Sequence, residues 1–314
     1  MGAAARVAAW PSVSFIVPLF NHLPQTQQMV DSLLAHMPAG LDHEIILTDD
    51  ASTDGTPGWL ATLSHPQIKT LQSKANRGYA ANNNAAARRA RGDVLALLNN
   101  DLLLQPGWLP PMLELLHSPQ AKVGVVGNVQ RRVSDGAIDH AGVALNASGQ
   151  LVHISDGSVL AAGRSVRQAT RLAVTGACML LRAADFWACG GLDEQYRNGA
   201  EDVDLCFKLR QRGLRACVAV DSCVRHHVSL SRDRTSLDNE RNSRLLFRRW
   251  RSLLKQELAA LWLDLLLRGG PFPESPEALI DTTLLVTPHL ASLRMAEALL
   301  VRQELRWQEL LGNL

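Results

Sequence analysis

An unbroken apolar run, VLALL at residues 94–98, stops abruptly at Asn99-Asn100-Asp101. Five consecutive apolar residues are typical of a strand that is buried on both faces, as in the parallel sheets of α/β proteins. A carboxylate at the end of such a strand lies at the carboxyl edge of the sheet, where open α/β sheets bind ligands. Taken alone, the same three residues also fit an ordinary turn, so the interpretation depends on the other strands.

Two earlier predicted strands also end in polar residues. The first covers residues 13–19 and the second residues 44–48, and they are followed by Phe20-Asn21 and by Asp49-Asp50, respectively. Helical patterns separate the strands, and this alternation predicts a layered α/β/α fold with a mainly parallel, mixed central sheet. Because the carboxyl ends of parallel strands lie at one edge, we expect the three polar clusters to converge on one crevice.

Periodicity and turn residues place the other elements. The early helices are predicted at 24–36, with Met29, Val30, Leu33 and Leu34 on one face, at 57–63, with Thr56 as the N-cap, and from Tyr79 to about Gly92. The later elements are strands at 68–71, 123–129, 173–181 and 214–220, helices at 108–117, 183–189 and 202–212, and hairpins and loops over 134–171. From Asn239 the pattern is helical and is broken at Gly269-Gly270-Pro271.

Composition excludes several classes of protein. With 46% hydrophobic and 20% charged residues the chain is globular, and a net charge of +2 argues against a dedicated nucleic-acid surface. The five cysteines form no C-x-x-C pair, which favours free thiols in a reducing, cytoplasmic compartment. Residues 1–11 are too short and too broken for a signal peptide, and no apolar run approaches the ~18 residues of a membrane span. Dinucleotide and P-loop glycine motifs are also missing.

The polar strand ends carry groups that suit a nucleotide and a metal. Asp50 could accept hydrogen bonds from a base or ribose, and Asp101 could hold a Mg²⁺ or Mn²⁺ ion that also grips a diphosphate. Gly78, near a helix start, would let the backbone approach a phosphate, with Arg77 beside it. Turn formation and capping are the structural alternatives for Asp50 and for Asp54, and solvation is the alternative for Arg77.

The second half contributes an acidic pair and a histidine pair. Glu201-Asp202 stands where a helix should begin, so Asp202 is either a simple cap or a general base that faces the crevice. His226 and His227 follow a predicted strand. Adjacent residues of an extended segment point to opposite faces, so at most one of the two faces a metal easily.

Eight motifs follow one another in a characteristic order within about residues 12–232: FIVPLFN, TDDASTDGT, NRGYAANNN, LLNND, VTGACMLLR, GGLDEQY, AEDVDLC and HHVSLSR. This series resembles glycosyltransferase family 2. The resemblance implies a GT-A fold, a nucleotide-diphosphate-sugar donor, a divalent metal (Mg²⁺ or Mn²⁺) and inversion at the anomeric carbon. It further implies that Asp50 binds the nucleobase, that Asp101 is the metal-binding residue of the D-x-D motif, and that Asp202 is the catalytic base.

The resemblance also implies roles for the neighbours of these residues. His226, rather than His227, would be a further metal or diphosphate contact. Beside Asp202, Glu201 and Asp204 would either orient the acceptor or cap the helix. The implied donor-binding residues are Pro18, Phe20, Asn21, Asp49, Asp50, Arg77, Gly78, Asn99 and Asn100. One departure is that Asn99 stands at the first Asp position of D-x-D, and a single carboxylate gives a weaker metal site than two.

The implied organisation is a GT-A catalytic domain over 1–235 and a C-terminal helical extension over 236–314. Within the domain, 12–101 would bind the nucleotide sugar and 102–235 the acceptor, a glycan or a lipid-linked glycan. The stretch IDHAGV at 138–143 resembles a subset of the family that builds bacterial surface polysaccharides. In that setting the enzyme would be cytoplasmic, or peripheral on the inner face of the cytoplasmic membrane.

Two other functions use similar chemistry. A sugar nucleotidyltransferase shares a layered fold and a metal, but it would normally carry a basic glycine-rich loop after the first strand, where this chain has Asn21-His22-Leu23-Pro24. A non-catalytic glycan-binding module of the same fold should lack the base, whereas Glu201-Asp202 is intact.

The segment 239–267 predicts a basic amphipathic helix. Its first 17 residues carry a local charge of +5, and the cations are Arg241, Arg244, Arg248, Arg249, Arg251 and Lys255. Apolar residues recur at helical spacing: Leu246, Trp250, Leu253, Leu254, Leu258, Leu261, Trp262 and Leu265. Such a helix either lies on an anionic membrane surface or packs its apolar stripe against the protein or a second subunit, for which the apolar segment 284–311 is a candidate.

Overall fold

The computed structural model describes residues 10–118, 122–157, 168–227, 236–268 and 288–312. Their Cα atoms group into two compact units. The first unit takes the described residues of 1–142 and 154–231, and the second takes those of 143–153 and 232–314. The predicted division of the catalytic part into donor and acceptor halves stays a prediction.

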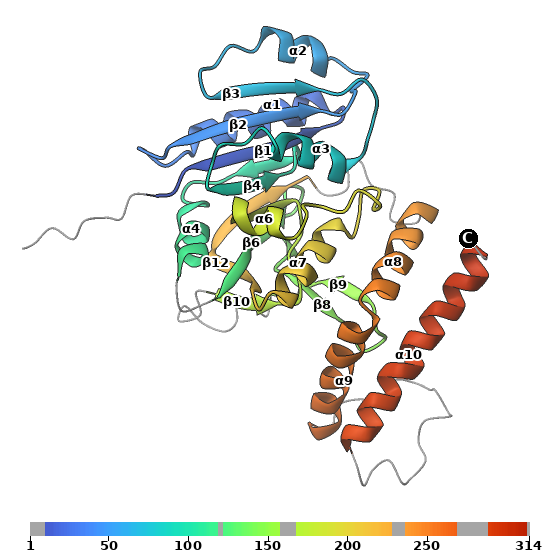
Figure 1. Ribbon diagram of the computed structural model, residues 1–314. Helices are drawn as coiled ribbons and strands as arrows, with labels where there is room; N and C mark the ends of the chain where they lie inside the picture. Colours follow the sequence, from blue (N-terminus) through green and yellow to red (C-terminus); the bar gives the residue numbers. More distant parts are fainter. Residues whose placement is uncertain (1–9, 119–121, 158–167, 228–235, 269–287, 313–314) are drawn as a thin grey trace, which may run out of the picture. The chain divides into compact units, whose positions relative to one another are not determined.

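The first unit is built on a mixed sheet of ten strands (Figure 1). Along the main path the order is β10-β12-β6-β11-β4-β1-β2-β3. The last four strands of this path are mutually parallel and comprise β4 Val94–Leu98, β1 Val13–Leu19, β2 His43–Asp49 and β3 Ile68–Gln72. All residues of β2 and β4 are buried, as expected for strands that are covered on both faces.

The other half of the sheet is mixed. Strand β11 (Cys178–Arg182) runs antiparallel to both β4 and β6 (Val123–Arg132), and β12 (Arg215–His226) runs parallel to β6. Three short strands complete the sheet: β10 Gln168–Arg171 and β5 Leu102–Leu104 on β12, and β7 Ile138–His140 on β6. The predicted fold class, a layered α/β/α structure with a mixed and largely parallel sheet, is confirmed.

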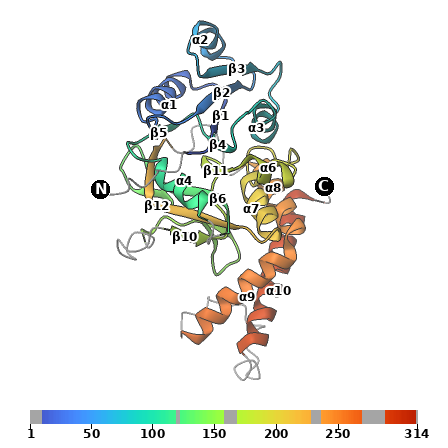
Figure 2. The same cartoon turned by 60° about the vertical axis from the view of Figure 1, so that its left-hand side comes forward.

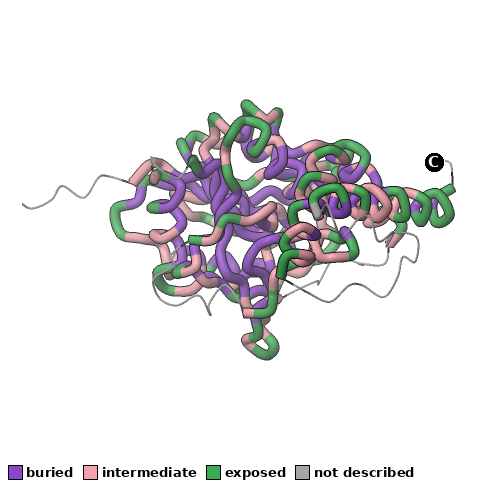
Figure 3. The backbone as a smooth tube through the Cα atoms, turned by 90° about the horizontal axis from the view of Figure 1, so that it is seen from below, coloured by how far each residue is buried: buried purple, intermediate pink, exposed green. Residues whose placement is uncertain are grey.

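Helices cover both faces of this sheet (Figure 2). Alternate residues of β1 face opposite sides of the sheet. Phe15 and Val17 pack into a cluster with α1 and α4, whereas Ile16 is buried on the other side. The helices are α1 Leu23–Ala35, α2 Thr56–Thr62, α3 Tyr79–Ala87, α4 Pro110–His117, α6 Ala183–Ala188 and α7 Glu201–Gln211. Seen from below, buried residues concentrate in the strands between these layers (Figure 3).

Several predicted boundaries are wrong for local reasons. Thr56 is the first residue of α2 rather than its N-cap, because the Asp54 carboxylate already accepts the Thr56 N–H at 2.9 Å. The strand predicted over 173–181 begins only at Cys178, since Gly176 lies in a turn. Helix α3 ends at Ala87, before the predicted end near Gly92. The strand β5 and the unbroken length of β12 were not predicted.

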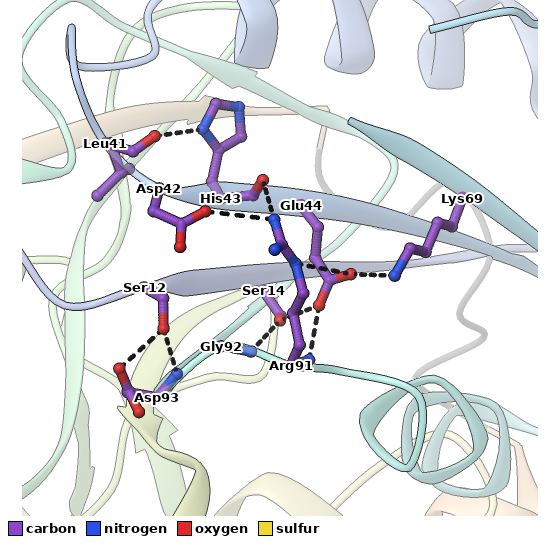
Figure 4. A network of polar contacts seen from close by, with 10 residues as sticks. All are labelled: Ser12, Ser14, Leu41, Asp42, His43, Glu44, Lys69, Arg91, Gly92 and Asp93. Carbon is purple, nitrogen blue, oxygen red and sulfur yellow. Dashed lines mark hydrogen bonds and ion pairs between the residues drawn. The ribbon is translucent and has the colours of Figure 1, made fainter. Parts of the chain in front are cut away.

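A buried carboxylate joins the amino ends of the parallel strands (Figure 4). The Glu44 side chain, 2% exposed, accepts hydrogen bonds from Ser14 Oγ at 2.7 Å, Lys69 Nζ at 2.7 Å and the Arg91 N–H at 2.6 Å. The donors come from β1, from β3 and from the turn before β4. This cluster lies at the edge of the sheet opposite to Asp50, so its role is to hold strands together.

The described residues of the second unit form helices α8, α9 and α10 and one hairpin (Figure 1). The helices are α8 Leu237–Arg249, α9 Arg251–Leu267 and α10 Pro288–Leu311, and the hairpin joins β8 Val143–Leu145 to β9 Leu151–His153. The helical segment after residue 239 breaks at Trp250, between α8 and α9, which the sequence did not predict. The break predicted at Gly269-Gly270-Pro271 lies outside the described residues. None of the described helices is both long and apolar enough to span a bilayer.

Helices α8 and α9 place their apolar stripe inside this unit. Leu246, Trp250, Leu254, Leu258 and Trp262 are buried, and the Phe247 ring packs edge-on against Trp307 of α10 with centroids 5.1 Å apart.

The cations of α8 and α9 pair with acids. Arg241 pairs with Asp238, Arg244 and Arg248 pair with Glu304, and Arg251 and Lys255 pair with Glu297. Arg249 also has a partner. This pairing supports the packing alternative, and contact of 239–267 with a membrane surface stays a prediction. Self-association through 239–267 stays a prediction.

Candidate functional site

Three strand ends meet at the carboxyl edge of the parallel strands. The Asn100 amide donates to Thr26 Oγ1 at 2.8 Å and to the Asn21 carbonyl at 3.4 Å. The Asn21 side-chain oxygen accepts the Thr53 N–H at 2.8 Å. The backbone N–H of Asn21 donates to Ser52 Oγ at 2.7 Å. The structure therefore joins the segments that follow β1, β2 and β4, which the sequence predicted to converge.

Asp50, at the end of β2, binds the backbone that begins α3. Its Oδ1 accepts the Arg77 N–H at 2.9 Å and its Oδ2 accepts the Gly78 N–H at 2.8 Å. Gly78 has a φ of +85°, which favours glycine. The exposed Arg77 guanidinium lies 3.7 Å from Glu194. Two of about four carboxylate lone-pair positions on Asp50 are used in this way, and the others can accept further hydrogen bonds.

The remaining donor-side candidates lie along the same edge. Asp49 is buried, Pro18 is partly buried in β1, and the Asn99 N–H donates to the Ala177 carbonyl at 2.8 Å. Phe20 is 41% exposed, which is unusual for an aromatic residue directly after a buried strand. Its ring offers apolar surface at the point where the sequence predicted a planar base.

Backbone strain is concentrated around this edge. Among the described residues six non-glycine residues have positive φ, and five of them follow β1, follow β2 or precede α7: Asn21, His22, Ala51, Asn198 and Ala200. Alanine has no side-chain hydrogen bond to offset this conformation, which costs about 1–2 kcal/mol for an L-residue. Strain of this kind persists where surrounding contacts hold it, and it is found often at functional sites.

Asp101, His226 and Asp139 form a second cluster at the same edge. His226, the last residue of β12, has its Nε2 3.2 Å from Asp101 Oδ1 and its Nδ1 3.6 Å from Asp139 Oδ2. Asp101 and His226 are both buried. His227 instead donates its backbone N–H to the Asp101 carbonyl at 3.0 Å. Of the two adjacent histidines, it is therefore the His226 imidazole that faces Asp101.

The charge of this cluster follows from its geometry. Burial lowers the pKa of His226, but the carboxylates of Asp101 and Asp139 outweigh burial and raise this pKa to about 9. Near neutral pH the imidazole is therefore protonated and lies between two carboxylates, and it must lose this proton before it can bind a metal.

The residues present fit a divalent ion that is shared with a substrate. Asp101 Oδ1 is buried and lies 3.2 Å from His226 Nε2, so both groups can turn to a shared ion once the imidazole has lost its proton. Over the same residues no group of three or more His, Cys, Asp or Glu side chains is arranged to hold a metal ion. Mg²⁺ and Mn²⁺ sites that use one or two protein ligands complete their coordination with substrate phosphates and water.

Asp202 lies in the first turn of α7 and is held by backbone donors. Its Oδ2 accepts the Gly176 N–H at 2.8 Å and its Oδ1 accepts the Val203 N–H at 2.8 Å. The adjacent Glu201 is buried and accepts the Gly199 N–H at 2.6 Å. Both carboxylates benefit from the positive end of the helix dipole. Asp202 remains partly exposed, so its unused lone pairs can reach a bound hydroxyl.

Three residues of this site were not singled out from the sequence. Tyr79 and Gly176 connect the start of α3 to Asp202, and Asp139 contacts His226. The only signal for Asp139 was its place in the stretch IDHAGV. No periodicity or spacing relates these residues, because each contact joins segments that are far apart in the chain.

Comparison with known proteins identifies the family. The model of the family described as "Glycosyl transferase family 2" matches residues 14–185, just over half of the chain. The O-antigen biosynthesis protein RfbC of Myxococcus xanthus is 31% identical over 232 residues, which are 72% of this chain and 18% of RfbC. The protein y4gI of Sinorhizobium fredii is 34% identical over 234 residues, which are 71% of this chain and 25% of y4gI. The chain thus spans a quarter or less of the length of these two relatives.

The fold has a clear counterpart among solved structures. The crystal structure of GalNAc-T7 with UDP, GalNAc and Mn²⁺ superimposes with a TM-score of 0.66 and covers 90% of this chain and 55% of GalNAc-T7, at 15% identity. At that identity the likeness concerns the fold, which is GT-A. The family match, the two relatives and the fold agree with one another, and the chain belongs to glycosyltransferase family 2.

Proposed function

We propose that this protein is an inverting, metal-dependent glycosyltransferase that moves a sugar from a nucleotide-diphosphate sugar to a hydroxyl acceptor. The observation that carries the proposal is the geometry of Asp202. Its carboxylate is held by two backbone N–H groups at a helix start, partly exposed, beside the strand ends that carry Asp50 and Asp101. Inversion by a single displacement at the anomeric carbon requires one base that is fixed beside the nucleotide-sugar site and takes the proton of the acceptor hydroxyl.

The donor would bind at the ends of β1, β2 and β4. The unused lone pairs of Asp50 accept hydrogen bonds from the base, and the exposed ring of Phe20 offers it apolar surface. The backbone at Gly78 lies at the start of α3, where a helix N-terminus favours phosphate. The presence of UDP in the crystal of GalNAc-T7 supports a nucleotide in this type of fold.

Asp101 and His226 would hold a divalent ion, Mg²⁺ or Mn²⁺. The closeness of the buried Asp101 carboxylate to the His226 ring supports this assignment, as does Mn²⁺ in the crystal of GalNAc-T7. Such an ion, when bound, neutralises negative charge that develops on a departing diphosphate. His226 contributes a neutral ring nitrogen after its proton is released.

Asp202 would remove the proton of the acceptor hydroxyl as that oxygen attacks the anomeric carbon. A positioned base of this kind contributes about 10²–10⁴-fold to the rate. Glu201, which is buried and bonded to the Gly199 N–H, supports the turn that presents Asp202 rather than the chemistry itself. The acceptor would be a glycan or a lipid-linked glycan of a bacterial surface polysaccharide, for which the name of RfbC is the support.

The proposal is tested by incubating the protein with UDP-, GDP- and dTDP-sugars and Mn²⁺ and measuring release of nucleoside diphosphate. We expect release with at least one donor, and an increase when a polysaccharide acceptor fraction is added. Release of pyrophosphate from a nucleoside triphosphate and a sugar phosphate would instead identify a nucleotidyltransferase. Glycan binding without any release would identify a non-catalytic module. Either of these last two results would overturn the proposal.

A further inference from the structure

Tyr79 links the start of α3 to Asp202 through one glycine, and we propose that it is a positioning residue for the base. This inference rests on the proposed function. It assigns to the Tyr79 hydroxyl the task of fixing Gly176, whose N–H in turn fixes one oxygen of Asp202.

The connection consists of two hydrogen bonds on either side of a single α-carbon. The Tyr79 hydroxyl donates to the Gly176 carbonyl at 2.8 Å, and the Gly176 N–H donates to Asp202 Oδ2 at 2.8 Å. Because Gly176 is free to rotate about both of its backbone bonds, an anchor on its carbonyl restricts the direction of its N–H. The phenol therefore determines where the donor to Asp202 points.

The space around Gly176 is matched to this arrangement. A Cβ atom at position 176 would lie 2.8 Å from the Tyr79 hydroxyl oxygen and 3.4 Å from the Asp202 Cβ. Only a residue without a side chain can stand between these two groups without displacing one of them. Burial and the carboxylates of Glu201 and Asp202 raise the pKa of Tyr79 well above its ordinary value, so the phenol keeps the proton that it donates.

The backbone of Tyr79 belongs to the donor side of the site. The two residues before it, Arg77 and Gly78, donate their N–H groups to Asp50, and the Tyr79 N–H donates to Asn198 Oδ1 at 2.9 Å. One short segment thus contacts the proposed nucleobase ligand through its backbone and the proposed base through its side chain. Because the two contacts belong to one segment, binding of the nucleotide sugar at Asp50 can affect the orientation of Asp202.

The chain contains two tyrosines, which provide a matched pair of variants. Tyr79→Phe removes only the hydroxyl above Gly176. Tyr196→Phe removes the hydroxyl that donates to Asp204 Oδ1 at 3.3 Å, from a side chain that is buried and contacts α7, whereas Tyr79 is partly exposed. Each change should lower stability, because each removes a phenol hydroxyl that donates a hydrogen bond inside the protein.

The expected result is a split between kcat and KM. Tyr79→Phe should lower kcat for diphosphate release by about 10-fold and leave the donor KM within about twofold, whereas Tyr196→Phe should change neither by more than about twofold. In an Asp202→Asn background the Tyr79→Phe change should have no further effect on turnover, since the group that it positions is gone. Equal losses of kcat in both backgrounds, or equal effects of the two tyrosine variants, would overturn the inference.

A stability measurement tests the geometry without any activity. Gly176→Ala should lower the melting temperature, and Tyr79→Phe should reduce this loss in the double variant because it removes the atom that the new Cβ meets. If the losses of melting temperature of the two single variants simply add in the double variant, the contact between Tyr79 and Gly176 would be refuted. If wild-type protein releases no diphosphate from any donor, the proposed function fails. If Asp202→Asn is inactive while Tyr79→Phe is fully active, only the present inference fails.

Discussion

At the scale of single residues, Asp202 decides whether the chemistry is assigned correctly. Replacing Asp202 by Asn keeps the shape of the side chain and lets its carbonyl accept the Gly176 N–H, but an amide cannot take a proton from an acceptor. We expect turnover to fall at least ~100-fold and the affinity for the nucleoside diphosphate to stay within about twofold. Single-turnover kinetics and calorimetry on the same preparation measure both quantities. Retention of more than roughly a tenth of the turnover would show that another group is the base.

Asp101 is the residue on which metal dependence should rest. Asp101→Ala removes the carboxylate next to His226 and leaves that histidine with Asp139 alone. We expect Mn²⁺ to strengthen binding of a nucleoside diphosphate to the wild-type protein and to have no effect on the variant. Asp264→Ala is a suitable control, because it removes an exposed carboxylate that pairs with Arg268 at the end of α9, in the second unit. An undiminished effect of Mn²⁺ on the Asp101 variant would refute the assignment.

The residues that could be predicted from the sequence are those whose position follows from the end of a strand or helix. Asp50 and Asp101 follow buried strands, and Asp202 follows the start of an acidic helix, so local pattern was sufficient to place them. Asp139, Tyr79 and Gly176 depend on how distant segments are brought together by β7, α3 and the turn before β11. The two uses of Asp50, as a turn ligand and as a candidate nucleobase ligand, could not be separated from sequence because both need the same carboxylate.

At the scale of elements, the errors of prediction occur where a neighbour outweighs the local pattern. Strand β5 has three residues and exists because it pairs with β12. The segment after residue 239 has a continuous helical pattern, yet Trp250 leaves helical geometry with φ −108° and ψ 19° while its ring is buried. The pairing of the basic face could not be predicted, because acids that bind its arginines lie on α10, more than 40 residues later.

The pairing of α10 with α8 and with α9 predicts unequal effects of two similar substitutions. Glu304 binds Arg244, whose side chain is 7% exposed, whereas Glu297 binds Arg251 and Lys255, which are about 40% exposed. Glu304→Ala leaves a buried guanidinium without its carboxylate and should cost about 2–3 kcal/mol, and Glu297→Ala should cost less than about 1 kcal/mol. Chemical denaturation monitored by tryptophan fluorescence measures the difference. Equal losses of stability would show that the burial of Arg244 is not relevant.

At the scale of the whole molecule, the first unit places its charged groups at two opposite edges of one sheet. The carboxyl ends of the parallel strands carry the candidate site with its strained residues, and the amino ends carry the Glu44 cluster (Figure 4). Strain at one edge has to be offset elsewhere, and a carboxylate that joins the starts of β1, β2 and β3 and the turn before β4 is one such source of stability.

Glu44 should therefore make stability depend on pH. Burial raises the pKa of Glu44, but hydrogen bonds from Lys69, Ser14 and Arg91 outweigh burial and hold this pKa below its ordinary value of 4.5. A group whose pKa is lowered by folding stabilises the protein above its unfolded pKa, and this contribution is lost as the pH falls through the folded pKa. The free energy of unfolding of Glu44→Gln should be about 2 kcal/mol below that of wild type at pH 7.

That difference should stay constant down to about pH 5 and shrink below pH 4.5, because the unfolded chain binds a proton at Glu44 near pH 4.5 whereas the folded protein binds it only at lower pH. Asp42→Asn provides the control, since Asp42 pairs with Arg91 in the same cluster but is 66% exposed, and its removal should change stability by less than about 0.5 kcal/mol at either pH. Urea titrations of the three proteins between pH 3.5 and pH 7 give the comparison. A wild-type advantage that persists unchanged below pH 4 would mean that Glu44 stabilises the strands through shape rather than through its charge.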